Sequence, residues 1–228
     1  MEIAKGIHRI DGVRGANSYL VLAGESAAVI DTGMPGNENR IVGYAKGAGL
    51  EPERLSYIVL THPDMDHSGS VAKLRSLTGA KVAIHEADSP RLSGEKKLKE
   101  VKGFMGVMLG VMNVFIRMTP VTPDIVLKNS DRILNLTVIH TPGHTAGSIC
   151  LYKENEAIFV GDALRVNSDG YPHLPSRSMN ADTEQAKESA RKISTYQYNL
   201  LLPGHGPAIT RDASKAVADY VQKEFAAG

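Results

Sequence analysis

The stretch LSYIVLTHPDMDH, residues 55–67, says more about the fold than any other part of the sequence. It begins with the apolar-rich run Leu55–Leu60, which has the length of a buried strand. The run leads directly into four side chains that can bind a metal ion, namely His62, Asp64, Asp66 and His67. Strand ends are where a sheet delivers side chains to a shared cleft. We therefore predict a buried strand whose carboxyl end carries a metal-binding loop, and the competing interpretation is a surface loop that caps the following helix.

The same step from an apolar strand to a polar residue recurs at four other places in the chain. The residues at these strand ends are Asp31, His144, Asp162 and His205. Imidazole and carboxylate groups together are the ligand set of zinc or iron sites that perform hydrolysis. Their repetition favours a metal centre over a capping loop.

Hydrophobic periodicity and turn residues predict the remaining elements. We expect short strands over residues 7–32, strands at Lys81–His85 and Leu134–His140, a hairpin of Ser148–Tyr152 with Ala157–Val160, and a strand at Leu200–Leu202. Helices are expected around Ile41–Ala45, over Ser70–Leu77, over Ala181–Tyr196 with Asn180 as its N-cap, and over residues 211–226. Because strands and helices mix in both halves, the pattern favours an α/β fold of layered sheets flanked by helices.

Composition narrows the class of protein. The chain has 228 residues, a length that predicts one domain or at most two small ones. Its 26 Lys and Arg nearly balance 25 Asp and Glu. A formal net charge of +1 argues against nucleic-acid binding through a broad basic surface. The single cysteine, Cys150, excludes an internal disulfide and a four-thiolate zinc site. The first residues lack the layout of a signal peptide and no apolar run has the length of a membrane span, so we expect a cytoplasmic protein.

The motifs, taken in order, resemble those of the metallo-β-lactamase-fold hydrolases. The matching segments are Thr-His62-Pro-Asp64-Met-Asp66-His67, Thr-Pro-Gly-His144-Thr, Gly-Asp162-Ala, Pro-Gly-His205-Gly and Asp31-Thr-Gly. The resemblance implies an αββα sandwich of two mixed β-sheets flanked by helices, in one domain over residues 1–228, with two metal ions. It assigns His62, Asp64 and His144 to one metal, assigns Asp66, His67 and His205 to the other, and makes Asp162 the bridge. Asp31 would orient a ligand from outside the coordination sphere.

The sequence departs from the family pattern at Asp64, where the commonest motif, H-x-H-x-D-H, has a histidine. Two divalent metals bring four positive charges, and Asp64, Asp66, Asp162 and a bridging hydroxide bring four negative ones. We therefore expect a harder, less Lewis-acidic first site. Zinc is the first expectation for both metals, with iron or manganese as the alternatives, and a site that holds a single metal is a further possibility.

The resemblance implies a metal-dependent hydrolase that uses a metal-bridging hydroxide, with Asp66 and Asp162 as catalytic residues. Its substrate would be a small ester, thioester, lactone or phosphodiester. One alternative is a diiron oxidoreductase or persulfide dioxygenase on the same fold. Asp64 suggests the diiron type, which would need electrons from a partner. A second alternative is a non-catalytic binding protein that the metal stabilises.

Several residues outside the motifs carry weaker expectations. Cys150 lies between Ile149 and Leu151 and is expected to be a core thiol. His8 and His85 are expected to be structural or surface residues, and His140 to be buried or to support the site. Tyr171 and His173 follow Asp162 in a loop that borders the active site in this family, so they are candidate substrate contacts.

A segment at about 90–128 is not explained by the motifs. Its stretch Gly103–Met118 is apolar nearly all round a helix and includes Met108 and Met112. We predict an apolar helical insertion with three possible roles: packing on the chain's own core, covering the metal cleft as a lid that contacts substrate through these two methionines, or forming a homodimer contact.

Overall fold

The computed structural model describes residues 1–96 and 119–225, which divide into two compact units. The first unit comprises residues 1–96 and 119–127, and the second comprises residues 128–225. The predicted helix at Gly103–Met118, with Met108 and Met112, lies outside the described residues.

The first unit is built on a seven-stranded sheet in the order β1-β2-β3-β4-β5-β6-β7. Its strands are Glu2–Ala4, Ile7–Arg9, Tyr19–Ala23, Ser26–Ile30, Leu55–Val59, Lys81–His85 and Ile125–Leu127. Strands β1 to β4 pair antiparallel, and β4 to β7 pair parallel, so the sheet is mixed.

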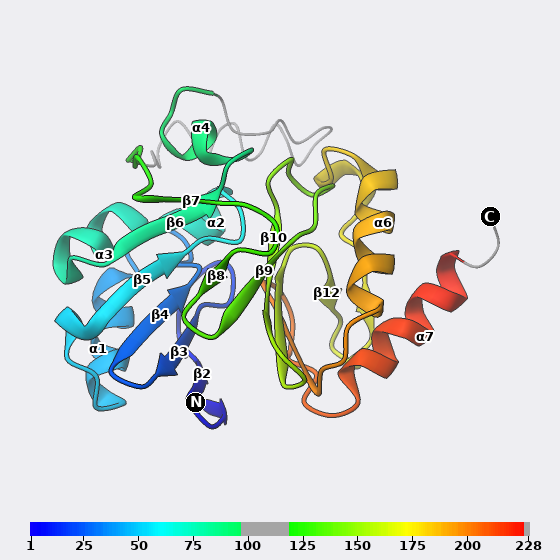
Figure 1. The fold of residues 1–228 in the computed structure, drawn as a ribbon, viewed down its shortest axis with the longest axis horizontal. Helices are drawn as coiled ribbons and strands as arrows, with labels where there is room; N and C mark the ends of the chain where they lie inside the picture. Colours follow the sequence, from blue (N-terminus) through cyan, green and yellow to red (C-terminus); the bar gives the residue numbers. More distant parts are fainter. Residues whose placement is uncertain (97–118, 226–228) are drawn as a thin grey trace. The chain divides into compact units, whose positions relative to one another are not determined.

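Helices cover this sheet through one apolar core. The helical segments of the unit are α1 (Glu38–Gly47), η1 (Pro52–Arg54), α2 (Met65–Ser68), α3 (Val71–Thr78) and α4 (Ser89–Leu92). Ile41 of α1 and Leu74 of α3 join Val29, Ile58 and Ile84 of the central strands in one buried cluster. Both helices therefore pack on the same side of the sheet, as Figure 1 shows.

The second unit has a five-stranded sheet in the order β14-β11-β10-β9-β8 and a small ribbon of β12 and β13. In chain order, β8 to β14 are Arg132–Ile133, Leu136–His140, Ile149–Lys153, Ala157–Gly161, Arg165–Val166, Pro172–His173 and Leu200–Pro203. The helical segments are η2 (Arg177–Met179), α6 (Thr183–Ser194) and α7 (Ala213–Phe225). Ile193 of α6 and Val217 of α7 are buried with Ile158 and Leu201 of the sheet, and the two helices lie together on one side of it (Figure 1).

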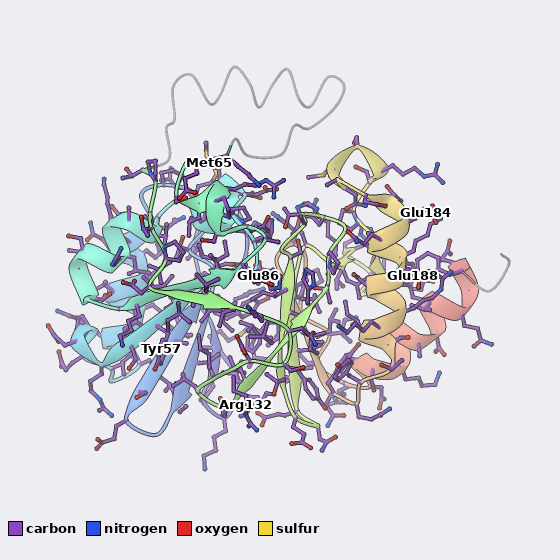
Figure 2. The ribbon with its side chains drawn as sticks, turned by 45° about the horizontal axis from the view of Figure 1, so that its top comes forward. Tyr57, Met65, Glu86, Arg132, Glu184 and Glu188 are labelled. Atoms are coloured by element: carbon purple, nitrogen blue, oxygen red, sulfur yellow. The ribbon has the colours of Figure 1, made fainter. Side chains whose placement is uncertain are left out.

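Helix α6 exposes its charged side and buries the other. Glu184 and Glu188, one turn apart, are exposed and point away from the sheet (Figure 2). Ala186, Ala190 and Ile193 are buried. This division is typical of a surface helix that contributes one apolar stripe to a core.

The predicted α/β class, with two mixed sheets flanked by helices, is confirmed. Two local expectations were wrong. Asp182, not Asn180, is the N-cap of α6, because its side chain accepts a hydrogen bond from the Gln185 backbone N–H. Leu134 has a left-handed φ of 52°, so the strand expected from that residue begins at Leu136.

The segment at 90–128 contains regular structure that the sequence did not indicate. Ile125–Leu127 pairs parallel with β6 and extends the first sheet by one strand. A run of three residues is too short for a periodicity argument, and its partner is distant in the sequence. Among the described residues, none of the helices combines the length and the apolar character that crossing a membrane requires.

Candidate metal centre

In the first unit, two neighbouring parallel strands place the candidate ligands at one edge of the sheet. Asp31 follows β4, and Thr61 to His67 follow β5, which pairs parallel with β4 through Ile30 and Val59. The carboxyl ends of parallel strands meet at the same edge, which explains why Asp31 reaches a loop thirty residues later. This juxtaposition follows from the sheet topology alone.

Asp31 is the centre of a buried hydrogen-bond cluster. Its Oδ1 accepts the Thr61 backbone N–H at 2.8 Å, and its Oδ2 accepts the Thr61 hydroxyl at 2.7 Å. His67 Nδ1 lies 2.8 Å from the same Oδ2. Because an ionised carboxylate only accepts, Nδ1–H is the donor, and Nε2 is the nitrogen of His67 that carries the lone pair. A metal ligand needs that lone pair.

Pairs of candidate ligands in this loop lie about as close together as two ligands of one metal ion would. His62 Nε2 lies 3.7 Å from Asp64 Oδ2, and His67 Nε2 lies 3.9 Å from Asp66 Oδ2. The rings of His62 and His67 are 4.0 Å apart between centroids. Both imidazoles are buried, whereas the side chains of Asp64 and Asp66 are 20 % and 37 % exposed. Met65, which lies between Asp64 and Asp66 in the sequence, is the first residue of α2 (Figure 2).

In the second unit, three strand ends again converge at one edge of a sheet. Strand β11 pairs parallel with β14 and antiparallel with β10, which is in turn antiparallel to β9. Strands β9, β11 and β14 therefore point the same way. The residues that follow them are His144, Asp162 and His205, which arrive together although 61 residues separate the first from the last.

Asp162 presents its two carboxylate oxygens to two different histidines. Oδ2 lies 3.7 Å from His144 Nε2, and Oδ1 lies 3.5 Å from His205 Nε2. The carboxylate and His144 are almost fully buried, while the His205 side chain is 25 % exposed. Each oxygen of this carboxylate therefore faces a different imidazole.

Arg165 is a fourth member of this cluster that no sequence pattern indicated. Its Nη2 donates to Asp162 Oδ2 at 2.7 Å. An arginine three residues after an aspartate is an ordinary surface pair in most sequences, so no pattern singled it out. The signal that could have found it is the need of a buried carboxylate for a counter-charge.

Two glycines allow the ligand loops to pass close to neighbouring backbone. A Cβ at Gly143, whose φ is +132°, would lie 2.3 Å from the Ala186 nitrogen at the start of α6. A Cβ at Gly206, whose φ is +95°, would lie 1.8 Å from the Val166 carbonyl oxygen. Only glycine fits either place. Each glycine adjoins a candidate ligand, His144 or His205.

The donor chemistry of both clusters fits divalent metal ions. Zinc binds imidazole nitrogen and carboxylate oxygen at 2.0–2.2 Å, so two tetrahedral ligands lie about 3.4 Å apart. The four nitrogen–oxygen distances given above fall between 3.5 and 3.9 Å. The two clusters are thus composed and spaced for metal binding.

The remaining candidates have local roles in the structure. Cys150 is fully buried, as expected, and burial raises its pKa to about 12. His85 is buried, and His140 is half-buried with Nε2 3.0 Å from the Ala146 carbonyl oxygen. His8 lies 3.4 Å from the Tyr44 hydroxyl.

The two residues proposed to contact substrate lie in the second unit. Tyr171 is 37 % exposed and packs edge-on against Tyr220. His173 Nδ1 lies 2.8 Å from the Leu174 carbonyl oxygen, so Nδ1–H donates and the lone pair resides on Nε2.

Comparisons with known proteins agree on a family. Residues 11–205 match the family model described as the metallo-beta-lactamase superfamily. The "Probable metallo-hydrolase YflN" of Bacillus subtilis is 29 % identical, over 92 % of this chain and 87 % of that protein. The bovine "Acyl-coenzyme A thioesterase MBLAC2" is 30 % identical, over 65 % of this chain and 58 % of that protein. The crystal structure of the metallo-beta-lactamase family protein TTHA1429 of Thermus thermophilus superposes with a TM-score of 0.75 at 20 % identity, covering 99 % of this chain and 81 % of that one.

Proposed function

Because the chain belongs to the metallo-beta-lactamase superfamily, we propose that it is a dinuclear metal-dependent hydrolase that acts on a small ester, thioester, lactone or phosphodiester. In this proposal residues 1–228 act as a single functional domain, as the family pattern implies. His62, Asp64 and His144 hold one ion, Asp66, His67 and His205 hold the other, and Asp162 bridges them. Zinc is the expected metal.

The observation that carries the proposal is the orientation of Asp162. Its two oxygens face His144 and His205, the histidines that the family pattern assigns to different ions. A single-metal site would need only one of these contacts. The hydrogen bond from His67 Nδ1 to Asp31 adds support, because it directs the Nε2 lone pair away from Asp31.

The chain's own side chains account for positioning and proton transfer. A bound metal pair supplies an acidified water as nucleophile and polarises the scissile carbonyl or phosphoryl oxygen. Asp66, whose side chain is 37 % exposed, accepts the proton of the attacking water and exchanges it with solvent. His173 Nε2, which carries the ring lone pair, accepts a hydrogen bond from the substrate. Tyr171 offers an aromatic wall beside Tyr220.

A thioester is the first substrate class to test, because one relative is named as an acyl-coenzyme A thioesterase. The experiment uses the purified chain, stripped by a chelator and reloaded with Zn²⁺, Fe²⁺ or Mn²⁺. Acyl-CoA thioesters, nitrophenyl esters, γ-lactones and a nitrophenyl phosphodiester form the panel. We expect turnover of at least one class with at least one metal, two ions per chain by elemental analysis, and loss of activity on chelation.

A matched pair of histidine variants controls for folding. His144→Asn should abolish turnover, whereas His140→Asn, four residues earlier and bonded to the Ala146 carbonyl, should retain most of it. No turnover with any metal would contradict the hydrolase and favour a binding protein. A coloured, iron-loaded protein that consumes oxygen and hydrolyses nothing would favour the oxidoreductase that Asp64 suggests.

A further inference from the structure

Arg165 holds a position in the second unit that the hydrolytic scheme does not use. It donates from Nη2 to Asp162 Oδ2 at 2.7 Å, and its side chain is 22 % exposed beside a carboxylate that is 2 % exposed. The oxygen that it contacts is the one that faces His144. The guanidinium charge therefore lies against one end of the bridging carboxylate.

The backbone around Arg165 is fixed to the loop that carries His205. Strand β12 pairs antiparallel with β13, with Arg165 opposite His173. The next residue, Val166, donates its N–H to the His205 carbonyl oxygen at 3.2 Å. The missing side chain of Gly206 allows this close approach. Arg165 is thus anchored to the same loop as a proposed ligand.

A cation that is hydrogen-bonded to a ligand oxygen reduces the electron density that this oxygen can donate to a metal. Most neighbours of metal ligands do the opposite, because they are carboxylates or carbonyls that accept a hydrogen bond from the ligand and make it more basic. Arg165 partly neutralises Oδ2, and its full charge also opposes a nearby divalent ion. The two ends of Asp162 are therefore unequal as ligands.

We propose that Arg165 is a positioning residue that makes the two metal sites unequal, by weakening the one that includes His144. This inference rests on the proposed dinuclear centre. By the family pattern the same site includes Asp64, a carboxylate where the commonest motif has a neutral histidine. Arg165 supplies a positive charge that offsets this extra negative charge of Asp64. The arginine therefore keeps the site from binding its ion too tightly.

The test measures zinc binding to the metal-free chain by competition with a chromophoric chelator, and needs no activity. Wild-type protein should bind two ions with dissociation constants at least about tenfold apart, and Arg165→Met should tighten the weaker site by about tenfold or more. Arg165→Lys keeps the charge and should retain the difference. Arg165→Gln keeps an N–H donor without the charge and should behave like Met.

The chain offers a matched control in Arg91, which pairs with Asp88 in the first unit. That pair has the same three-residue separation, a distance of 2.8 Å and side chains 23 % and 0 % exposed. Arg91→Met should lower stability as Arg165→Met does, but leave both zinc affinities unchanged. Because Asp162 regains a counter-charge when zinc binds, zinc should raise the Tm of Arg165→Met more than that of Arg91→Met.

Four results would overturn the inference. Arg165→Met with unchanged or weaker zinc affinity would remove the effect, and Arg165→Gln that matches wild type would show that charge is not its cause. Two sites of equal affinity in the wild type would contradict the proposed asymmetry while leaving the dinuclear hydrolase intact. A wild-type chain that binds no zinc would instead reject the metal centre, and this inference with it.

Discussion

Asp31 combines backbone strain with three buried hydrogen bonds. Its φ of 55° lies in the left-handed region, which costs a residue with a side chain about 1–2 kcal/mol. The contacts to Thr61 N, Thr61 Oγ1 and His67 Nδ1 hold it there. Strain that surrounding contacts maintain is typical of functional sites. The residue therefore couples the end of β4 to a candidate ligand.

We expect Asp31→Ala to lower the free energy of unfolding by about 3 kcal/mol, because a buried cluster loses its acceptor and the strain stays. Urea denaturation measures this loss. Asp31→Asn should cost less, since asparagine tolerates the left-handed region and keeps one carbonyl oxygen. Its amide, however, offers N–H to His67 Nδ1 in place of a carboxylate. The proton then moves to His67 Nε2, and zinc content should fall.

Asn155 is a control that separates the effect of backbone strain from the effect of the lost hydrogen bonds. Its φ is also 55°, and it lies in the exposed turn between β10 and β11. Asn155→Ala should cost only about 1 kcal/mol, because strain alone changes. Equal losses for Asn155→Ala and Asp31→Ala would mean that the cluster around Asp31 adds no stability.

At the scale of elements, the start of α6 is tied to the loop of His144. The Asp182 backbone N–H donates to the Gly143 carbonyl oxygen at 2.9 Å, and the Ala181 N–H donates to the His144 carbonyl oxygen at 3.2 Å. The Asp182 side chain caps the helix at the Gln185 N–H, 3.0 Å away. Helix position and ligand position are thus linked through two successive residues.

Removing this cap should have a measurable and local effect. Asp182→Ala should lower the free energy of unfolding by about 1 kcal/mol, which is typical of a lost aspartate N-cap. Asn180→Ala, two residues earlier, is the control and should cost less than about 0.5 kcal/mol, since its amide only contacts the Pro175 carbonyl at 3.4 Å. Urea denaturation of both variants compares them. A larger loss at Asn180 would reverse the assignment of the cap.

The same helix shows why sequence predicted the elements better than their ends. Alternation and apolar runs indicated β5, β6, β10 and β11 because burial of one strand leaves a local pattern. Asn180 and Asp182 are both good N-cap residues, but the backbone of Asp182 is held by the Gly143 carbonyl, about forty residues away in the sequence. Strand β7 depends on β6 in the same way. Pairing across such distances leaves no local signal.

The candidate ligands were predictable because each follows an apolar strand and has a side chain that binds metals. Arg165 was not, since its contact with Asp162 depends on how β12 turns back along the His205 loop. Asp31 shows the intermediate case. Its place after β4 was readable, but its bonds to Thr61 and His67 required the parallel pairing of β4 with β5.

At the scale of the whole molecule, each unit buries groups that can lose a proton. Burial raises the pKa of Cys150 to about 12, from an ordinary value of 9.0. It also raises the pKa of Tyr19 in the first unit and of Tyr198 in the second, above their ordinary 10.0. All three side chains are nearly inaccessible to solvent. The folded chain therefore keeps protons that the unfolded chain releases at alkaline pH.

This difference predicts alkaline destabilisation of both units. Between pH 9 and 12 the unfolded state binds fewer protons than the folded state, so the free energy of unfolding falls as pH rises. Each retained proton contributes about 1.4 kcal/mol per pH unit. Because only the thiol has an ordinary pKa near 9, it should dominate the first part of the decline. Urea denaturation of the reduced protein at pH 8, 9, 9.5 and 10 measures the slope.

Cys150→Ser isolates the thiol, because serine keeps a polar group beside the Thr141 hydroxyl and does not ionise in this range. Whatever its stability at pH 8, this variant should lose less with each pH step between 9 and 10 than the wild type. The tyrosine contribution should persist in both proteins above pH 10. Parallel curves from pH 8 to 10 would mean that the thiol ionises as readily in the folded chain as in the unfolded one, contrary to its burial in the second core.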